Sequence, residues 1–136
     1  MQIKVYEEYL SDDVSGFIVI QKENFHQYNS NRVIVVNLSD SARRRRFTIA
    51  HELAHYVLHK GNDELFAHRD AGQNDGIEHE ANVFATNILM PKDLVFKVLD
   101  GVWSKMPSVL KIRHVADTFA VSLSAAQVRL EQLNIV

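Results

Sequence analysis

The chain has 136 residues, the length of one domain, and its 46% hydrophobic and 24% charged residues are typical of a globular rather than a disordered protein. It contains no cysteine, which excludes disulfides, thiolate metal ligands, iron–sulfur clusters and a cysteine nucleophile. The formal net charge of −2 gives no reason to expect bulk electrostatic binding to nucleic acid.

Three segments near the N-terminus have the pattern of β-strands. Residues 2–5 alternate polar and apolar side chains, and residues 16–21 and 32–38 are apolar and rich in β-branched residues. The polar segments 11–16 and 23–31 predict a turn and a loop. We expect the second and third segments to pair as an antiparallel hairpin.

The rest of the chain has helical periodicity. Residues 39–41 offer N-caps for a helix that extends to residue 60, with an apolar stripe formed by Phe47, Ala50, Leu53, Ala54 and Val57. After a predicted loop at 62–76, further helices are expected at 77–90, 92–99, 109–119 and 122–133. Because the strands come first and the helices follow, the sequence predicts an α+β fold. We expect one domain, 1–136, in which a small N-terminal antiparallel sheet packs on the first helix.

No segment is suited to crossing a membrane. The longest purely apolar runs, residues 17–20 and 33–36, are far shorter than the about 20 residues that a transmembrane helix needs. The N-terminus lacks the apolar stretch of a secretory signal. We therefore expect a cytoplasmic protein without a membrane partner.

The first predicted helix contains an H-E-x-x-H motif. Its histidines, His51 and His55, are four residues apart and so share one face of the helix, where both can reach one ion. They are expected just off the edge of the apolar stripe. Glu52 lies between them and need not be a ligand, which leaves it available to take a proton from water. A surface helix with two solvated histidines is the alternative interpretation.

A catalytic zinc site usually has three protein ligands, so a third His, Asp or Glu is needed. The metzincin spacing fails, because it would require glycine at Leu58 and histidine at Gly61. His59 continues the i+4 series but is better explained as a cation at a helix C-terminus.

The next predicted helix offers two carboxylates for this role, Glu78 and Glu80. On a helical projection Glu78 lies closer to the centre of the apolar stripe than Glu80 does. Asn82, four residues after Glu78, shares its side and could orient a ligating histidine.

Two segments carry a resemblance to a known family. Residues 46–59 (RFTIAHELAHYVLH) and 78–91 (EHEANVFATNILMP) resemble the signatures of the ImmA/IrrE family of metallopeptidases. The family pattern often has glycine where this chain has Ala54. The resemblance implies a small gluzincin-like fold, with His51 and His55 as metal ligands, Glu52 as general base and Glu78 as third ligand.

The function that follows is that of a zinc-dependent endopeptidase with Zn²⁺ as cofactor. An extended substrate could pair with an exposed strand edge, and residues 32–38 are the expected strand. The resemblance implies that the substrate is one particular helix-turn-helix transcriptional repressor, cleaved to relieve repression. Tyr56, His68 and His114 are candidates to stabilise the oxyanion, and the sequence does not choose among them.

Two other functions remain open. The chain could be a non-catalytic module that binds a regulator, although such a module would not need Glu52. The last two helices resemble a helix-turn-helix, but alanine replaces the usual turn glycine at Ala120 and the second helix has only Arg129 as a base. Arg43–Arg46, spread around a helix, cannot form one phosphate-binding patch, so direct binding of nucleic acid is not expected.

Overall fold

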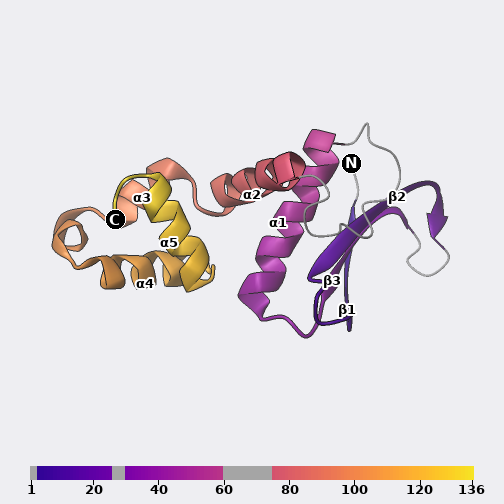
Figure 1. Cartoon of the computed structure of the whole chain (residues 1–136), viewed down its shortest axis with the longest axis horizontal. Helices are drawn as coiled ribbons and strands as arrows, with labels where there is room; N and C mark the ends of the chain where they lie inside the picture. The colour runs from indigo at the N-terminus through magenta and orange to yellow at the C-terminus, as the bar shows by residue number, and fades with distance from the viewer. Residues whose placement is uncertain (1–2, 26–29, 60–74) are drawn as a thin grey trace. The chain divides into compact units, whose positions relative to one another are not determined.

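The computed structural model describes residues 3–25, 30–59 and 75–136 (Figure 1). In this part of the chain, strands precede helices, which confirms the predicted α+β class. The elements are β1 (Lys4–Glu8), β2 (Gly16–Phe25), β3 (Ser30–Asn37), α1 (Ala42–His59), α2 (Asp75–Leu89), α3 (Lys92–Val98), the 3₁₀ helix η1 (Gly101–Lys105), α4 (Ser108–Phe119) and α5 (Leu123–Gln132).

The chain divides into two compact units, Met1–Ala85 and Thr86–Val136. The N-terminal unit contains the sheet, α1 and most of α2, and the C-terminal unit contains the end of α2 with the helices that follow. None of the helices among the described residues has the length and apolarity needed to cross a bilayer.

The described sheet has the strand order β1-β3-β2. β2 and β3 pair antiparallel as predicted, with Ile18 opposite Ile34. β1 runs parallel to β3, with Val5 opposite Ile34, so the prediction of a wholly antiparallel sheet is wrong and the sheet is mixed. The reason is that β1 and β2 run in opposite directions like the arms of a hairpin, but β3 inserts between them.

The predicted loop at 23–31 is also partly wrong. Residues 23–25 extend β2 and residues 30–31 begin β3, while 26–29 lie outside the described residues. Phe25 pairs with Ser30, and this pairing overrides the weak strand propensity of the polar residues beside them. The predicted loop at 62–76 lies outside the described residues up to residue 74, and α2 already begins at Asp75.

α1 packs against β2 and β3 in the N-terminal unit. The core there consists of buried Ile18, Ile34 and Val36, with Ile49 and Leu53 of α1 packed against them. Gly16 is required for the close approach, because a Cβ atom at this position would lie 2.6 Å from Thr48 Cγ2 and 2.7 Å from the Val35 carbonyl oxygen. The sheet therefore fixes the position of α1.

The arginines at the start of α1 make contacts within the fold. The Ser41 hydroxyl caps the helix by accepting the backbone N–H of Arg44. Arg44 Nε donates to Ser15 Oγ at 3.1 Å and lies 3.4 Å from the Asp40 carboxylate. Arg45 Nη1 donates to the Leu38 carbonyl oxygen. These contacts anchor the first turn of α1 to the loops beside it.

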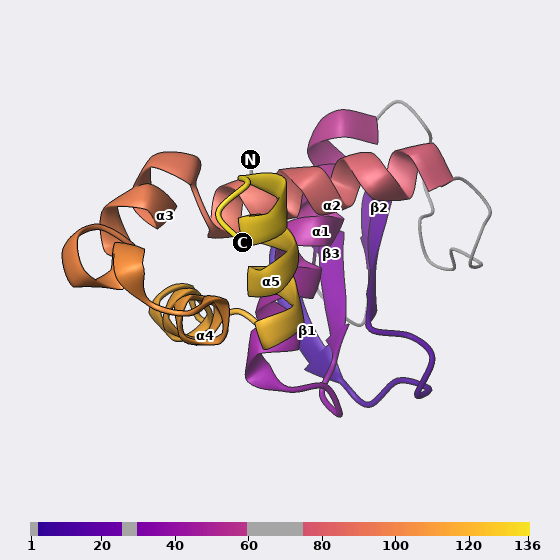
Figure 2. The ribbon, with the colours of Figure 1, turned by 60° about the vertical axis from the view of Figure 1, so that its left-hand side comes forward.

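The α4–α5 pair is joined by a tight turn (Figure 2). Ala120 ends α4 in the left-handed conformation, with φ 53° and ψ 52°, at the position where the sequence lacks the expected glycine. Ser122 then caps α5 by accepting the backbone N–H of Ala125. Arg129, the one base on α5, is buried, and its Nε donates to the Met90 carbonyl oxygen at 3.0 Å.

Asn37 joins the end of β3 to the loop between β1 and β2. The residue is 1% exposed, and its Nδ2 donates to the carbonyl oxygens of Leu10, Ser11 and Val14. Its Oδ1 accepts the backbone N–H groups of Leu10 and Ser39. One side chain thus satisfies backbone groups of the β1–β2 loop and of the residues that follow β3.

We expect Asn37→Ala to lower the free energy of unfolding by about 2–4 kcal/mol, because several backbone groups lose their partner at once. Urea unfolding followed by circular dichroism measures the change. The matched control is Asn87→Ala, at an exposed position of α2, where the effect should stay within about 0.5 kcal/mol. Equal effects at the two positions would contradict the role given to Asn37.

We expect Ala120→Gly to raise the free energy of unfolding by about 0.5–1 kcal/mol, because glycine adopts the left-handed conformation without the Cβ penalty. Thermal unfolding measures this effect. Ala125→Gly, inside α5, should have the opposite sign, since glycine costs about 1 kcal/mol relative to alanine within a helix. A loss of stability at both positions would show that the turn is not strained.

Candidate metal centre

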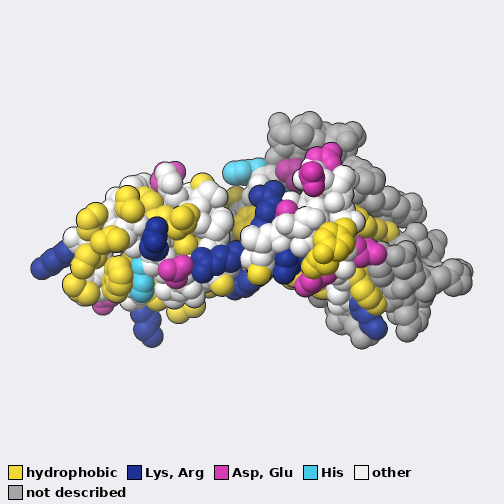
Figure 3. Space-filling view, turned by 90° about the horizontal axis from the view of Figure 1, so that it is seen from below, with side chains coloured by type: hydrophobic (Ala, Val, Ile, Leu, Met, Phe, Trp, Pro, Cys, Tyr) yellow, Lys and Arg dark blue, Asp and Glu magenta, His cyan; other side chains and the backbone are white. Residues whose placement is uncertain are grey.

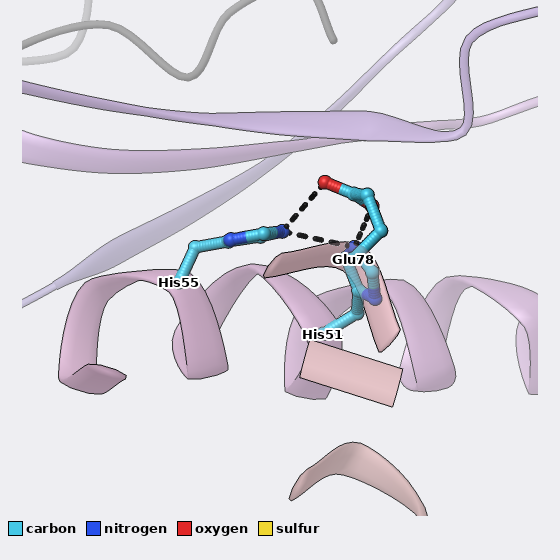
Figure 4. A group of neighbouring side chains, drawn as sticks. All are labelled: His51, His55 and Glu78. Carbon is cyan, nitrogen blue, oxygen red and sulfur yellow. Dashed lines mark hydrogen bonds and ion pairs between the residues drawn. The ribbon is translucent and has the colours of Figure 1, made fainter. Parts of the chain in front are cut away.

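His51, His55 and Glu78 point toward one another (Figure 4). Glu78 Oε2 lies 3.0 Å from His51 Nε2, and Glu78 Oε1 lies 3.1 Å from His55 Nε2. The two histidine Nε2 atoms are 3.2 Å apart. Among the described residues, no other group of three or more His, Asp or Glu side chains converges in this way.

The helices explain the convergence. His51 and His55 are one turn apart on α1, so their rings project from the same face and meet edge to face, 4.8 Å between centroids. His55 is fully buried, whereas the side chain of His51 is 14% exposed. The prediction that both histidines lie just off the buried stripe is therefore wrong for His55. Val57, expected in that stripe, is 44% exposed, so the buried face of α1 is rotated toward the motif.

Asn82 makes the predicted contact with a histidine of the motif. Its Oδ1 lies 2.8 Å from His51 Nδ1 and accepts the hydrogen of that nitrogen. With the hydrogen on Nδ1, the lone pair of His51 is on Nε2, the atom that faces His55 and Glu78. Asn82 and Glu78 are one turn apart on α2, so a single face of that helix supplies both groups.

The three side chains fit a divalent ion. Two imidazole nitrogens and one carboxylate form a donor set found in catalytic zinc sites. In a tetrahedral site with bonds of about 2.0–2.1 Å, ligand atoms lie about 3.3 Å apart, close to the 3.2 Å between the two histidine Nε2 atoms. The carboxylate of Glu78 lies beside both nitrogens, with one oxygen 3.0 Å from His51 Nε2 and the other 3.1 Å from His55 Nε2. His51, His55 and Glu78 could therefore hold such an ion without rearrangement of either helix.

The remaining candidates lie elsewhere. Glu80 is exposed and outside the group, while Glu52 is 2% exposed on α1 and is not one of the three converging residues. Tyr56 packs against the core of the N-terminal unit. His114, in the C-terminal unit, is 3.2 Å from the Val98 carbonyl oxygen through Nε2 and stacks on Trp103.

Two of the predicted positions cannot be compared with this geometry. His68 lies outside the described residues, and so does the side chain of His59.

Two histidines of an H-E-x-x-H helix and a glutamate from the next helix match the donor set expected of a metallopeptidase-type centre. The sequence of residues 11–131 matches a peptidase family that is described as the IrrE N-terminal-like domain. The chain belongs to this family, which the two resembling segments had indicated.

The match to curated relatives with similar sequences covers only part of the length of each relative. The "Radiation response metalloprotease IrrE" of Deinococcus radiodurans is 31% identical over 71% of this chain and 30% of its own length. The "Metallopeptidase ImmA" of Bacillus subtilis is 29% identical over 48% of this chain and 39% of its own. The "Uncharacterized immunity region protein 2" of Bacillus phage phi105 is 36% identical over 49% and 44%. This chain thus spans less than half the length of each.

Proposed function

We propose that this chain is a zinc-dependent endopeptidase. The observation that carries the proposal is the convergence of His51, His55 and Glu78 on one point. Membership of a peptidase family supports it. The family match crosses the boundary between the two compact units, which supports treating residues 1–136 as one metallopeptidase domain.

In this proposal the residues have separate roles. His51, His55 and Glu78 hold Zn²⁺, and the ion, when bound, acts as a Lewis acid that polarises a carbonyl and lowers the pKa of water. Glu52 takes the proton of the attacking water and transfers it to the leaving amine. Asn82 keeps the hydrogen of His51 on Nδ1, so that Nε2 remains available as a ligand.

The strand edge that pairs with an extended substrate must differ from the predicted one. β3, which contains most of residues 32–38, is paired on both sides, by β1 and β2, so it offers no backbone edge. The prediction took residues 32–38 for an exposed edge with which a substrate backbone could pair, but a continuous apolar strand such as β3 takes the centre of the sheet. In the described sheet, β2 is the outer strand that packs against α1, so we assign the substrate to its outer edge.

The proposed substrate is a helix-turn-helix transcriptional repressor in the cytoplasm. The family resemblance and the name of the phage relative, an immunity region protein, support a regulatory protein as the substrate. Direct binding of DNA through α5 has little support, because Arg129 is buried and donates to Met90 within the C-terminal unit. The non-catalytic binding module remains the alternative that experiment must separate.

We expect Glu78→Ala to weaken zinc binding strongly, because two histidines alone hold zinc poorly. Glu80→Ala is the matched control: this carboxylate lies on the same helix but is exposed and outside the converging group, so zinc content should stay near normal. Elemental analysis of the two purified variants measures the difference. The opposite ranking would remove Glu78 from the metal centre.

We expect Glu52→Gln to retain zinc and to lose cleavage of the repressor by several orders of magnitude, since glutamine has the same shape but cannot accept the proton. Zinc content and cleavage, followed by gel electrophoresis with and without a chelator, are measured on the same preparation. Casein serves as the substrate control and should be cut little.

The outcomes separate the proposed functions. If the Glu52→Gln variant binds the repressor and relieves repression as well as the unchanged chain, the binding module is the better explanation. Broad degradation of casein would contradict both the cleavage of one repressor and the binding module. A mobility shift of DNA with the purified chain would support DNA binding through the C-terminal helices.

A further inference from the structure

We propose that the C-terminal unit carries a docking site for an acidic segment of a protein partner. The site is a hollow with a volume of about 160 Å³, lined by Phe96, Leu99, Ser104, Lys111 and Ile135. All five residues belong to the unit Thr86–Val136. They come from α3 and the residue after it, η1, α4 and the end of the chain. The inference does not rest on the proposed peptidase activity, because no residue of the metal centre takes part in it.

Large hydrophobic side chains are exposed on the surface of this unit. Figure 3 shows hydrophobic side chains gathered over it, with basic side chains among them. Most exposed large hydrophobic residues of the described part of the chain lie in this unit: Ile88, Leu94, Phe96, Val102, Val109, Leu110, Leu123, Val128 and Val136. Exposed apolar surface of this kind, rimmed by polar groups, marks sites of protein interaction.

The charge around the hollow selects the partner. Lys111 lines it, and exposed Lys97 and Lys105 directly follow Phe96 and Ser104 in the sequence. The ion pairs found among the described residues involve none of these lysines. The carboxylate of Asp100 accepts the backbone N–H of Gly101 at 2.8 Å and so caps η1. Among the described residues, Lys111 is the one charged residue that lines the hollow, and its ammonium favours a carboxylate of a partner.

The size of the hollow limits what enters it. An apolar cavity of about 150 Å³ binds benzene, so this hollow has room for one ring or one branched side chain. The occupant is then a bulky apolar residue with aspartate or glutamate beside it. A hollow that holds one side chain favours a protein partner over a membrane, because membrane insertion uses an extended apolar face.

The test uses the full chain and a labelled amphipathic peptide of leucine and glutamate. A peptide in which lysine replaces every glutamate is the charge control, and one in which serine replaces every leucine is the apolar control. Fluorescence anisotropy gives the affinity, and Trp103, the chain's single tryptophan and the neighbour of Ser104, gives an intrinsic signal. We expect the leucine–glutamate peptide to bind at least about tenfold more tightly than either control, and less tightly at high salt.

Two variants test the lining of the hollow. Phe96→Ser and Lys111→Glu should each weaken binding of the leucine–glutamate peptide by about tenfold or more. Val128→Ser and Lys92→Glu are the matched controls, since both residues are exposed on the same unit and neither lines the hollow. Lys111→Glu should in addition bind the lysine peptide more tightly, a gain that an unfolded variant could not produce.

Three results would overturn the proposal. The first is equal affinity for the glutamate and lysine peptides, and the second is binding that neither lining variant changes more than the controls do. The third is binding to vesicles of phosphatidylserine and phosphatidylcholine without binding of either peptide, which would assign the surface to a membrane. Cleavage of the repressor plays no part in these readings, so their failure leaves the proposed peptidase function standing.

Discussion

One carboxylate joins two consecutive helices of the described chain. The two oxygens of Glu78, on α2, reach the Nε2 atoms of His51 and His55, on α1, at 3.0 and 3.1 Å. Each helix must present two side chains, four residues apart, to the other helix. These are His51 and His55 on α1, and Glu78 and Asn82 on α2. A shift of either helix by one residue would turn its pair away by about 100° and separate the donors.

The sheet supports this geometry rather than supplying ligands. α1 can lie close to β2 only because Gly16 has no side chain opposite Thr48, and Ile49 and Leu53 then pack on the core formed by β2 and β3. Asn37 holds the loop between β1 and β2 against the end of β3, just before α1 begins. The contacts of the sheet and its loops thus fix the position of α1, the helix that carries both histidines.

Local patterns in the sequence predicted α1 to α5 and the side of α2 that Glu78 and Asn82 share, but not the 3₁₀ helix η1. The choice of Glu78 over Glu80 follows from 100° steps along one helix, and the contact of Asn82 with His51 follows from the same face. The strand order could not be predicted from local patterns, because no feature of residues 2–8 indicates that β3 lies between β1 and β2. The burial of His55 and the exposure of Val57 were missed for a similar reason, since a stripe read from one helix omits what packs against its other side.

The proposed chemistry and the proposed recognition use different parts of the chain, and selectivity requires both. Three metal ligands and a general base act on any peptide bond that reaches them, and an edge of β2 pairs with any extended backbone. Neither distinguishes one protein from another. A hollow that admits one apolar side chain beside Lys111 distinguishes between partners, because a partner without the matching carboxylate leaves a lysine partly desolvated and unpaired.

α2 connects the two parts, with Glu78 and Asn82 in the N-terminal unit and its last turn in the C-terminal unit. The family match extends across both units, so the two proposed roles lie within one family domain.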